Sequence, residues 1–328
     1  MGHMMASRGR QICQPDDIGR GVPGARVLVS AGACLALLFG SFAAVAADRP
    51  TTRTFEAEGA SIRVDFASTN FKYGSAPVVA WIRRSVAVVA RYYGQFPAKH
   101  LRIQVSVHDG SRVRHGTTYG TFVPSIRLQL GRDVTAEELR NDWVLVHEMV
   151  HLALPAVGED HPWFTEGLST YIEGIARVQA GDLPAERVWT EQVRSMPKGL
   201  PEPGDQGLDR THTWGRTYWG GALFCLLADV EIRKKTENRL GLRDAMRAVL
   251  RETGGVAFDV PIERVLKIGD EATNTTVLQD LYAQMKDKPV SPDLQDLWQQ
   301  LGIQLKGDSV ELRVDAPLAA TRDAIMTP

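Results

Sequence analysis

The motif HEMVH at residues 147–151 limits the folds open to this chain more than any other feature of its sequence. On an α-helix, residues four positions apart lie on the same face, so the imidazoles of His147 and His151 can bind one metal ion. Glu148 lies beside that face and can take a proton from a water at the metal. The motif therefore predicts a helix that carries two metal ligands and a general base.

The residues around this motif indicate where its helix begins and ends. Thr135 and Glu138 have the spacing of a capping box, which marks a helix start. Apolar residues surround the two histidines, and Pro155 interrupts the helical pattern. We expect one helix over 135–154, a short loop, and a second helix over 163–180.

A third metal ligand is expected on the second helix. A catalytic zinc site usually has three protein ligands and leaves one position for water. Glu166 lies near the start of the second helix, and a short loop lets the two helices pack antiparallel, so Glu166 can face the histidines. Glu173, two turns further along the same face, is the competing carboxylate. Glu159, Asp160 and His161 in the loop are further alternatives, and we expect one Zn²⁺ per chain.

Composition excludes several other classes of protein. The chain has 38 basic and 39 acidic residues and a formal charge of −1, which argues against a nucleic-acid-binding protein, because such proteins usually carry a basic excess. Its three cysteines include no Cys-x-x-Cys pair and cannot form a disulfide framework. Cys225 lies in an apolar segment and is expected to be buried. The sequence therefore offers no cysteine pair for a redox site or a thiolate–metal site.

The remaining pattern predicts an α+β fold, with a small N-terminal sheet and one helix followed by a helical C-terminal half. Strands are expected over 53–66 with a turn at Gly59, over 101–107 and over 125–130, with a helix over 77–96. Residues 108–124 predict a loop or an irregular hairpin. Further helices are expected over 184–196, 213–236, 242–252, 261–268, 275–286 and 292–301, and a last strand over 309–314.

The first 47 residues have the pattern of a secretory signal. An apolar run over 27–47 follows two arginines and ends in small residues, so we expect cleavage after Ala47. The protein would then be exported, either periplasmic or secreted, with one catalytic domain over 48–328 and no membrane span. The run is long enough to cross a bilayer if it stays uncut, which leaves a membrane anchor as the alternative. Residues 1–5 resemble a cloning remnant.

These segments resemble the gluzincin metallopeptidases, and most nearly the catalytic domain of the glycyl aminopeptidase family. Residues 147–151 match the metal-and-base motif of these families. WFTEGLSTY at 163–171 is similar to their Trp-x-x-Glu-Gly segment, and 217–236 is similar to a Tyr-x-x-Gly stretch. The resemblance covers about 100–300 and implies a thermolysin-like unit, bound zinc, a peptide or protein substrate, and an oxyanion-stabilising hydroxyl on Tyr218.

Two features of the family pattern are missing. Gly220 stands where a lysine is usual, and there is no Gly-x-Met-Glu-Asn segment, which in the larger aminopeptidases helps recognise the free amine of the substrate. Endopeptidase and aminopeptidase activities therefore both remain open. The alternative functions are a zinc-binding but weak or inactive peptidase-like module of the cell envelope, and a hydrolase of non-peptide amides.

Tyr218, Thr170 and one strand have further candidate roles. Tyr218 can instead pack as a core aromatic beside Trp214 and Trp219. Thr170 can hydrogen-bond a metal ligand or its own backbone. By analogy with the fold, the strand over 125–130 is a candidate edge to which an extended peptide can add.

Overall fold

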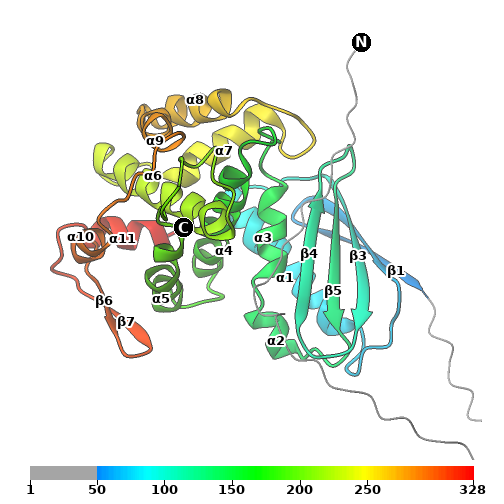
Figure 1. The fold of residues 1–328 in the computed structure, drawn as a ribbon. Helices are drawn as coiled ribbons and strands as arrows, with labels where there is room; N and C mark the ends of the chain where they lie inside the picture. Colours follow the sequence, from blue (N-terminus) through cyan, green and yellow to red (C-terminus); the bar gives the residue numbers. More distant parts are fainter. Residues whose placement is uncertain (1–49) are drawn as a thin grey trace, which may run out of the picture.

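A five-stranded sheet lies beside a larger helical part in the computed structural model, which describes residues 50–328 (Figure 1). The sheet strands are β1 (Thr51–Ala57), β2 (Ala60–Phe66), β3 (His100–His108), β4 (Val113–Tyr119) and β5 (Ser125–Gly131). The helices are α1 (Ala76–Tyr93), α2 (Ala136–Asn141), α3 (Val144–His151), α4 (Pro162–Gln179), α5 (Ala185–Ser195), α6 (Gly221–Lys235), α7 (Leu242–Thr253), α8 (Ile262–Thr273), α9 (Val277–Met285), α10 (Leu294–Gln300) and α11 (Ala319–Met326). The predicted α+β class is confirmed, whereas the predicted signal peptide over 1–47 lies outside the described residues.

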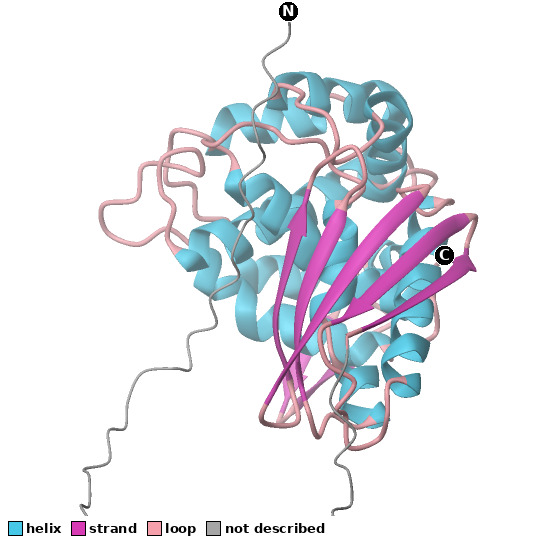
Figure 2. Ribbon diagram, turned by 90° about the vertical axis from the view of Figure 1, so that its right-hand side faces the viewer, coloured by secondary structure: helices cyan, strands magenta, loops and turns pink. Residues whose placement is uncertain are grey.

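The sheet has the strand order β1-β2-β3-β5-β4. Strands β2, β3 and β5 run parallel, and the two outer strands β1 and β4 pair antiparallel with their neighbours. The chain crosses from β2 to β3 through α1, as parallel neighbours require. In Figure 2 the sheet lies in front of the helices, so among the described residues the helices cover one of its faces. That covered face is apolar and fixes the strand register.

The segment over 108–124 forms a hairpin with β5. Strand β4 occupies most of this segment and pairs antiparallel with β5, with an irregularity between Val113 and His115. Because β4 takes the free side of β5, the prediction that residues 125–130 form the sheet edge is wrong. Polar residues and Gly116 break the apolar alternation of β4, so only its pairing with β5 identifies it as a strand.

The predicted helix over 135–154 is two helices, α2 and α3. The capping box is confirmed: the Glu138 amide donates to Thr135 Oγ1 at 3.1 Å, and the Thr135 amide donates to Glu138 Oε2 at 2.8 Å. The chain then leaves the helix at Asp142, which is extended (φ −71°, ψ 141°). The Asp142 carboxylate accepts the amide of Val144 at 2.9 Å, so α3 starts afresh at this point.

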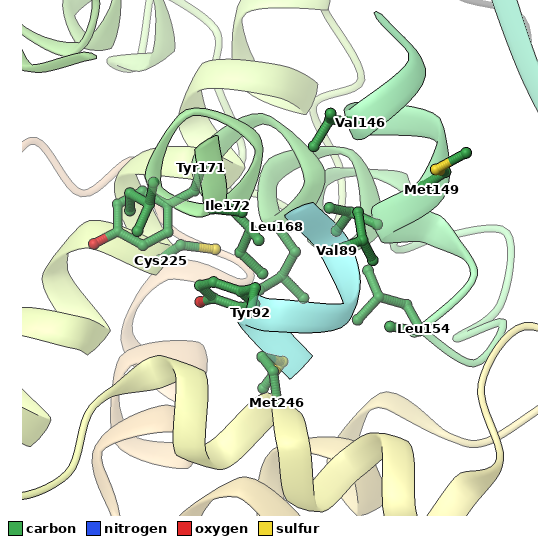
Figure 3. Close-up of a cluster of buried hydrophobic side chains, with 14 of the residues drawn as sticks. Val89, Tyr92, Val146, Met149, Leu154, Leu168, Tyr171, Ile172, Cys225 and Met246 are labelled. Atoms are coloured by element: carbon green, nitrogen blue, oxygen red, sulfur yellow. The ribbon is translucent and has the colours of Figure 1, made fainter. Parts of the chain in front are cut away.

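An apolar cluster joins the helices that carry the candidate metal ligands. Figure 3 shows side chains of α1, α3, α4, α6 and α7 meeting in it, including Val89, Met149 and Leu168. Cys225 also lies there, 1% exposed, as its sequence context predicts. Burying each large apolar side chain contributes about 1.5–3 kcal/mol, so this cluster fixes how α3 packs on α4.

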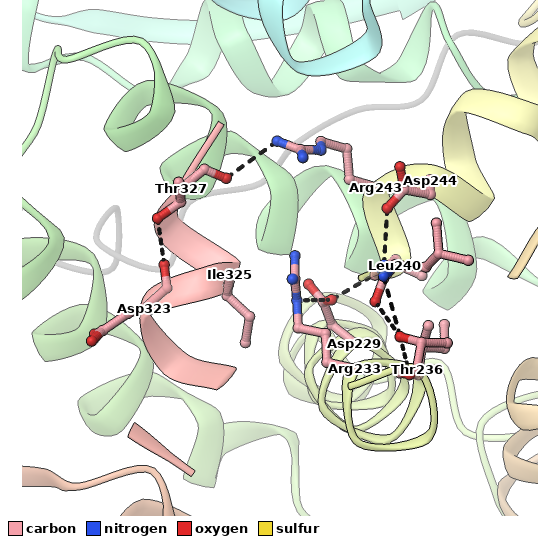
Figure 4. A network of polar contacts seen from close by, with 12 residues as sticks. Asp229, Arg233, Thr236, Leu240, Arg243, Asp244, Asp323, Ile325 and Thr327 are labelled. Atoms are coloured by element: carbon pink, nitrogen blue, oxygen red, sulfur yellow. Dashed lines mark hydrogen bonds and ion pairs between the residues drawn. The ribbon is translucent and has the colours of Figure 1, made fainter. Parts of the chain in front are cut away.

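A buried carboxylate links the next layer of helices. Asp229 on α6 accepts hydrogen bonds from Arg233 Nε at 2.9 Å, from the Tyr171 hydroxyl on α4 at 3.1 Å and from the Leu242 amide at 3.0 Å. Figure 4 also shows Arg243 of α7, which donates to the main-chain oxygen of Thr327 at 3.2 Å. The C-terminal end of the chain is thereby tied to α7.

The later helices agree with the sequence prediction within a few residues, except that α8 extends five residues further, to Thr273. The elements that the sequence analysis missed in this half include α11 and β6 (Ile303–Lys306), which pairs with β7 (Ser309–Leu312). The predicted helix over 213–236 begins as a π-helical turn, Arg216–Gly220, before α6. Among the described residues, no helix combines the length and apolar character needed to cross a membrane.

Candidate metal centre

The structure brings together the side chains of His147, His151 and Glu166. One donor atom from each lies within 4.8 Å of the other two. Glu166 Oε2 is 3.2 Å from Nε2 of His147 and 3.4 Å from Nε2 of His151. The side chain of Glu166 is 5% exposed, that of His147 is 1% exposed and that of His151 is 11% exposed. Two imidazoles and one carboxylate are a donor set that suits Zn²⁺ better than Mg²⁺ or Ca²⁺.

A close contact between two glycines brings the third ligand to this position. Glu166 is in the first turns of α4, which packs on α3 and α6. A Cβ atom at Gly167 would lie 2.3 Å from the Cα of Gly221, and one at Gly221 would lie 2.0 Å from the main-chain oxygen of Trp163. The two helix backbones therefore touch, which explains physically why glycine follows Glu166.

The second ring nitrogens of the two histidines have different surroundings. His151 Nδ1 lies 3.2 Å from Ser169 Oγ, so the structure gives to Ser169 the supporting contact that the sequence suggested for Thr170. His147 Nδ1 is buried and has no hydrogen-bond partner among the described residues. The ring of His147 packs edge-on against Trp143, with centroids 5.4 Å apart. These contacts orient both rings toward Glu166.

The electrostatics keep Glu166 ionised. Burial raises the pKa of its carboxyl, but the charges and hydrogen bonds of His151 and His147 outweigh burial and hold that pKa well below its ordinary value. A carboxylate must be deprotonated to bind a metal, so Glu166 is ready to act as a ligand.

Glu148 lies beside the donor set in a different environment. Burial raises its pKa to about 7, with Glu166 adding to the shift, while His147 and a hydrogen bond from Thr118 oppose it. Its Oε2 accepts the Thr118 hydroxyl at 2.6 Å, whereas its Oε1 is buried without a hydrogen-bond partner among the described residues. A buried oxygen of this kind needs a partner such as water, which fits a metal site with an open position.

The competing ligands lie elsewhere. Glu173 accepts Arg177 Nη1 at 2.6 Å, in a buried pair that also reaches the main-chain oxygen of Arg140. His161 Nδ1 is 3.0 Å from Asp209 Oδ1, and the loop residues 159–160 are exposed. The geometry therefore favours Glu166 among the carboxylates considered.

We expect Glu166→Ala to lose most of its zinc and Glu173→Ala to keep it. Glu166 supplies one of three donors, whereas Glu173 pairs with Arg177. Removing the Glu173 carboxylate leaves the buried Arg177 charge without its ion-pair partner, which should cost about 3–5 kcal/mol of stability. Glu173→Ala should therefore melt at a lower temperature with its zinc still bound. Metal analysis together with thermal unfolding measures both effects. Zinc loss in Glu173→Ala and retention in Glu166→Ala would show that the wrong carboxylate was chosen.

Tyr218 approaches the donor set from the π-helical turn. Its ring stacks on that of His147, with centroids 6.3 Å apart and an interplanar angle of 27°, and lies 5.8 Å from that of Trp214. Arg216, at the start of the turn, forms a buried ion pair with Asp205 at 2.7 Å and donates to the Gly199 oxygen at 2.6 Å. π-helical turns frequently occur at functional sites, and this one places a tyrosine beside a candidate metal ligand.

The fold is similar to that of a solved structure from the aminopeptidase N family. The chain resembles a protein of the aminopeptidase N family from Idiomarina loihiensis, with a TM-score of 0.59 and 14% identity, over 77% of this chain and 49% of that one. It also matches an M1 zinc metallopeptidase from Deinococcus radiodurans, with a TM-score of 0.47 and 13% identity, over 75% and 53% of the two chains. The chain thus spans about half the length of these proteins. No family model and no curated protein matches it.

Proposed function

We propose that this chain is a zinc-dependent peptidase. The observation that carries the proposal is the convergence of His147, His151 and Glu166 beside Glu148, whose buried Oε1 has no partner among the described residues. The shared fold with an aminopeptidase N family protein supports the same conclusion. The proposal includes a thermolysin-like catalytic unit that is most similar to the catalytic domain of the glycyl aminopeptidase family.

His147, His151 and Glu166 would hold the metal, one Zn²⁺ per chain. When bound, zinc would polarise the scissile carbonyl and lower the pKa of water toward ~7. All three ligands are fixed by buried contacts on α3 and α4, so their position does not depend on a flexible loop.

Two side chains beside the metal ligands, Glu148 and Tyr218, would carry out proton transfer and charge stabilisation, respectively. Glu148 takes the proton of the attacking water on Oε1 and later passes it to the leaving amine. The Tyr218 hydroxyl donates a hydrogen bond to the oxyanion that forms on the carbonyl oxygen when water attacks the carbonyl carbon. The stack of Tyr218 on His147 supports this role, because it keeps the phenol next to the donor set.

The substrate in this proposal is a peptide or protein, cleaved at an internal bond or at the amino terminus. The protein would act outside the cytoplasm, after removal of residues 1–47, as a single catalytic domain over 48–328. The apolar run over 27–47 and its small-residue end support export.

A peptide-library assay tests the proposal. Purified protein with about one zinc per chain should cleave some library members, lose that activity with a chelator and regain it when zinc is restored. The chelated protein without added zinc is the control for the restored sample. A zinc-loaded protein that cleaves no library member would instead indicate a binding module with a peptidase fold, and cleavage of non-peptide amides alone would indicate a different hydrolase.

A further inference from the structure

We infer that Thr118 is a positioning residue: it holds one oxygen of the Glu148 carboxylate so that the other is presented to the attacking water. This inference rests on the proposed peptidase function. The residue lies on β4, outside the helices that carry the metal-site motif, and nothing in the sequence pattern singled it out.

The hydroxyl of Thr118 binds Glu148 at two points. Its Oγ1 is 2.6 Å from Glu148 Oε2 and 2.8 Å from the main-chain oxygen of Glu148. The single hydroxyl proton of Thr118 on the edge strand is therefore shared between the carboxylate and the main-chain oxygen of the same residue. The first distance is that of a charge-assisted hydrogen bond, which is the stronger kind. The contact fixes the carboxylate against α3 instead of leaving it free to rotate.

Gly116, two residues earlier, leaves the space into which Glu148 fits. Residues at this spacing lie on the same face of a strand. A Cβ atom at Gly116 would lie 2.7 Å from Glu148 Cγ and 3.1 Å from Oε1, so a side chain here would collide with the glutamate. Gly116 therefore leaves room beside Oε1, while Thr118 binds Oε2. Since Oε1 is buried without a partner among the described residues, it is the oxygen left for water.

Catalysis depends on this orientation. Proton transfer needs Oε1 within hydrogen-bond reach of the attacking water. A displacement of about 1 Å in such a group can cost ~10²-fold in rate. Loss of the Thr118 hydroxyl should therefore reduce kcat and leave zinc binding unchanged, because the hydrogen bonds of Thr118 in the described structure go to Glu148 and not to a metal ligand.

Three variants test the inference. Thr118→Val keeps the shape and removes the hydroxyl, Thr118→Ser keeps the hydroxyl, and Thr117→Val is the matched control. Thr117 bonds to His115 and its side chain points to the opposite face of the strand. We expect Thr118→Val to lower kcat by ~10–10²-fold with KM and zinc content unchanged. Thr118→Ser and Thr117→Val should retain most of the wild-type kcat.

Crystal structures of the zinc-loaded wild type, Thr118→Val and Thr118→Ser give a readout that needs no activity. The Glu148 carboxylate should keep its position in wild type and Thr118→Ser and rotate or spread over several positions in Thr118→Val. An unchanged carboxylate in Thr118→Val, or an equal kcat loss in the valine and serine variants, would overturn the inference. An inert wild type would refute the peptidase function, and the crystal structures would still decide the role of Thr118.

Discussion

Replacing Glu148 with glutamine is expected to lower the rate of peptide hydrolysis by at least ~10²–10⁴-fold, the range ascribed to general acid–base catalysis. Glutamine keeps the size and shape of the side chain but cannot take the proton from water. Because Glu148 is not one of the three converging donors, zinc content and melting temperature should hardly change. Steady-state kinetics, metal analysis and thermal unfolding of the same preparation measure all three quantities.

The rate loss of Tyr218→Phe provides a comparison for the rate loss of Glu148→Gln. Loss of one oxyanion donor should reduce kcat by ~10²–10³-fold, less than the loss expected for Glu148→Gln. The ring stack on His147 should survive, because phenylalanine keeps the aromatic ring. A Glu148→Gln variant that hydrolyses peptides at the wild-type rate would remove Glu148 from the mechanism and favour the binding-module function.

His147→Ala and His151→Ala should each abolish zinc binding. Each imidazole supplies one of only three donors, and alanine leaves a buried gap beside Glu166. The expected zinc content of each variant is close to zero, compared with about one ion per chain in the wild type. Metal analysis after gel filtration measures this, and peptidase activity should be lost in parallel.

His161→Ala is the matched control for the histidine variants. It removes an imidazole that contacts Asp209 and not the donor set, so zinc content should stay at the wild-type value. If both His147→Ala and His151→Ala keep their zinc, the ion is bound at another place and the proposed centre is wrong.

The sequence predicted best those parts of the site that depend on helical spacing. Two histidines four residues apart point the same way on any helix, and a short loop limits where the next helix can go. For this reason His147, His151 and Glu166 could be chosen before their convergence was known. Glu173 lies on the same helix, and its ion pair with Arg177, four residues later, is also compatible with helical spacing but was not foreseen.

The parts that sequence reasoning missed depend on contacts between distant segments. β4 lacks a clear apolar alternation, and its identity as a strand comes from pairing with β5. Because β4 was not assigned, the bond from Thr118 to Glu148 could not be predicted, although Gly116 two residues earlier was a possible signal of close approach. The break between α2 and α3 at Asp142 was also missed, although it is a local feature in which the Asp142 carboxylate accepts the Val144 amide.

The apolar cluster between α1, α3 and α4 has a thermodynamic consequence for metal exchange (Figure 3). The core side chains that orient α3 and α4 do not include a metal ligand. The conformational entropy lost when the ligands come together is therefore offset by apolar packing during folding and not by metal binding. In zinc fingers, by contrast, the binding free energy of the ion is the folding free energy. Here the ion would enter a preorganised set of donors, and its affinity would reflect the chemistry of these ligands and their supporting contacts. The apoprotein would then be a folded species, able to release and recapture its metal without unfolding.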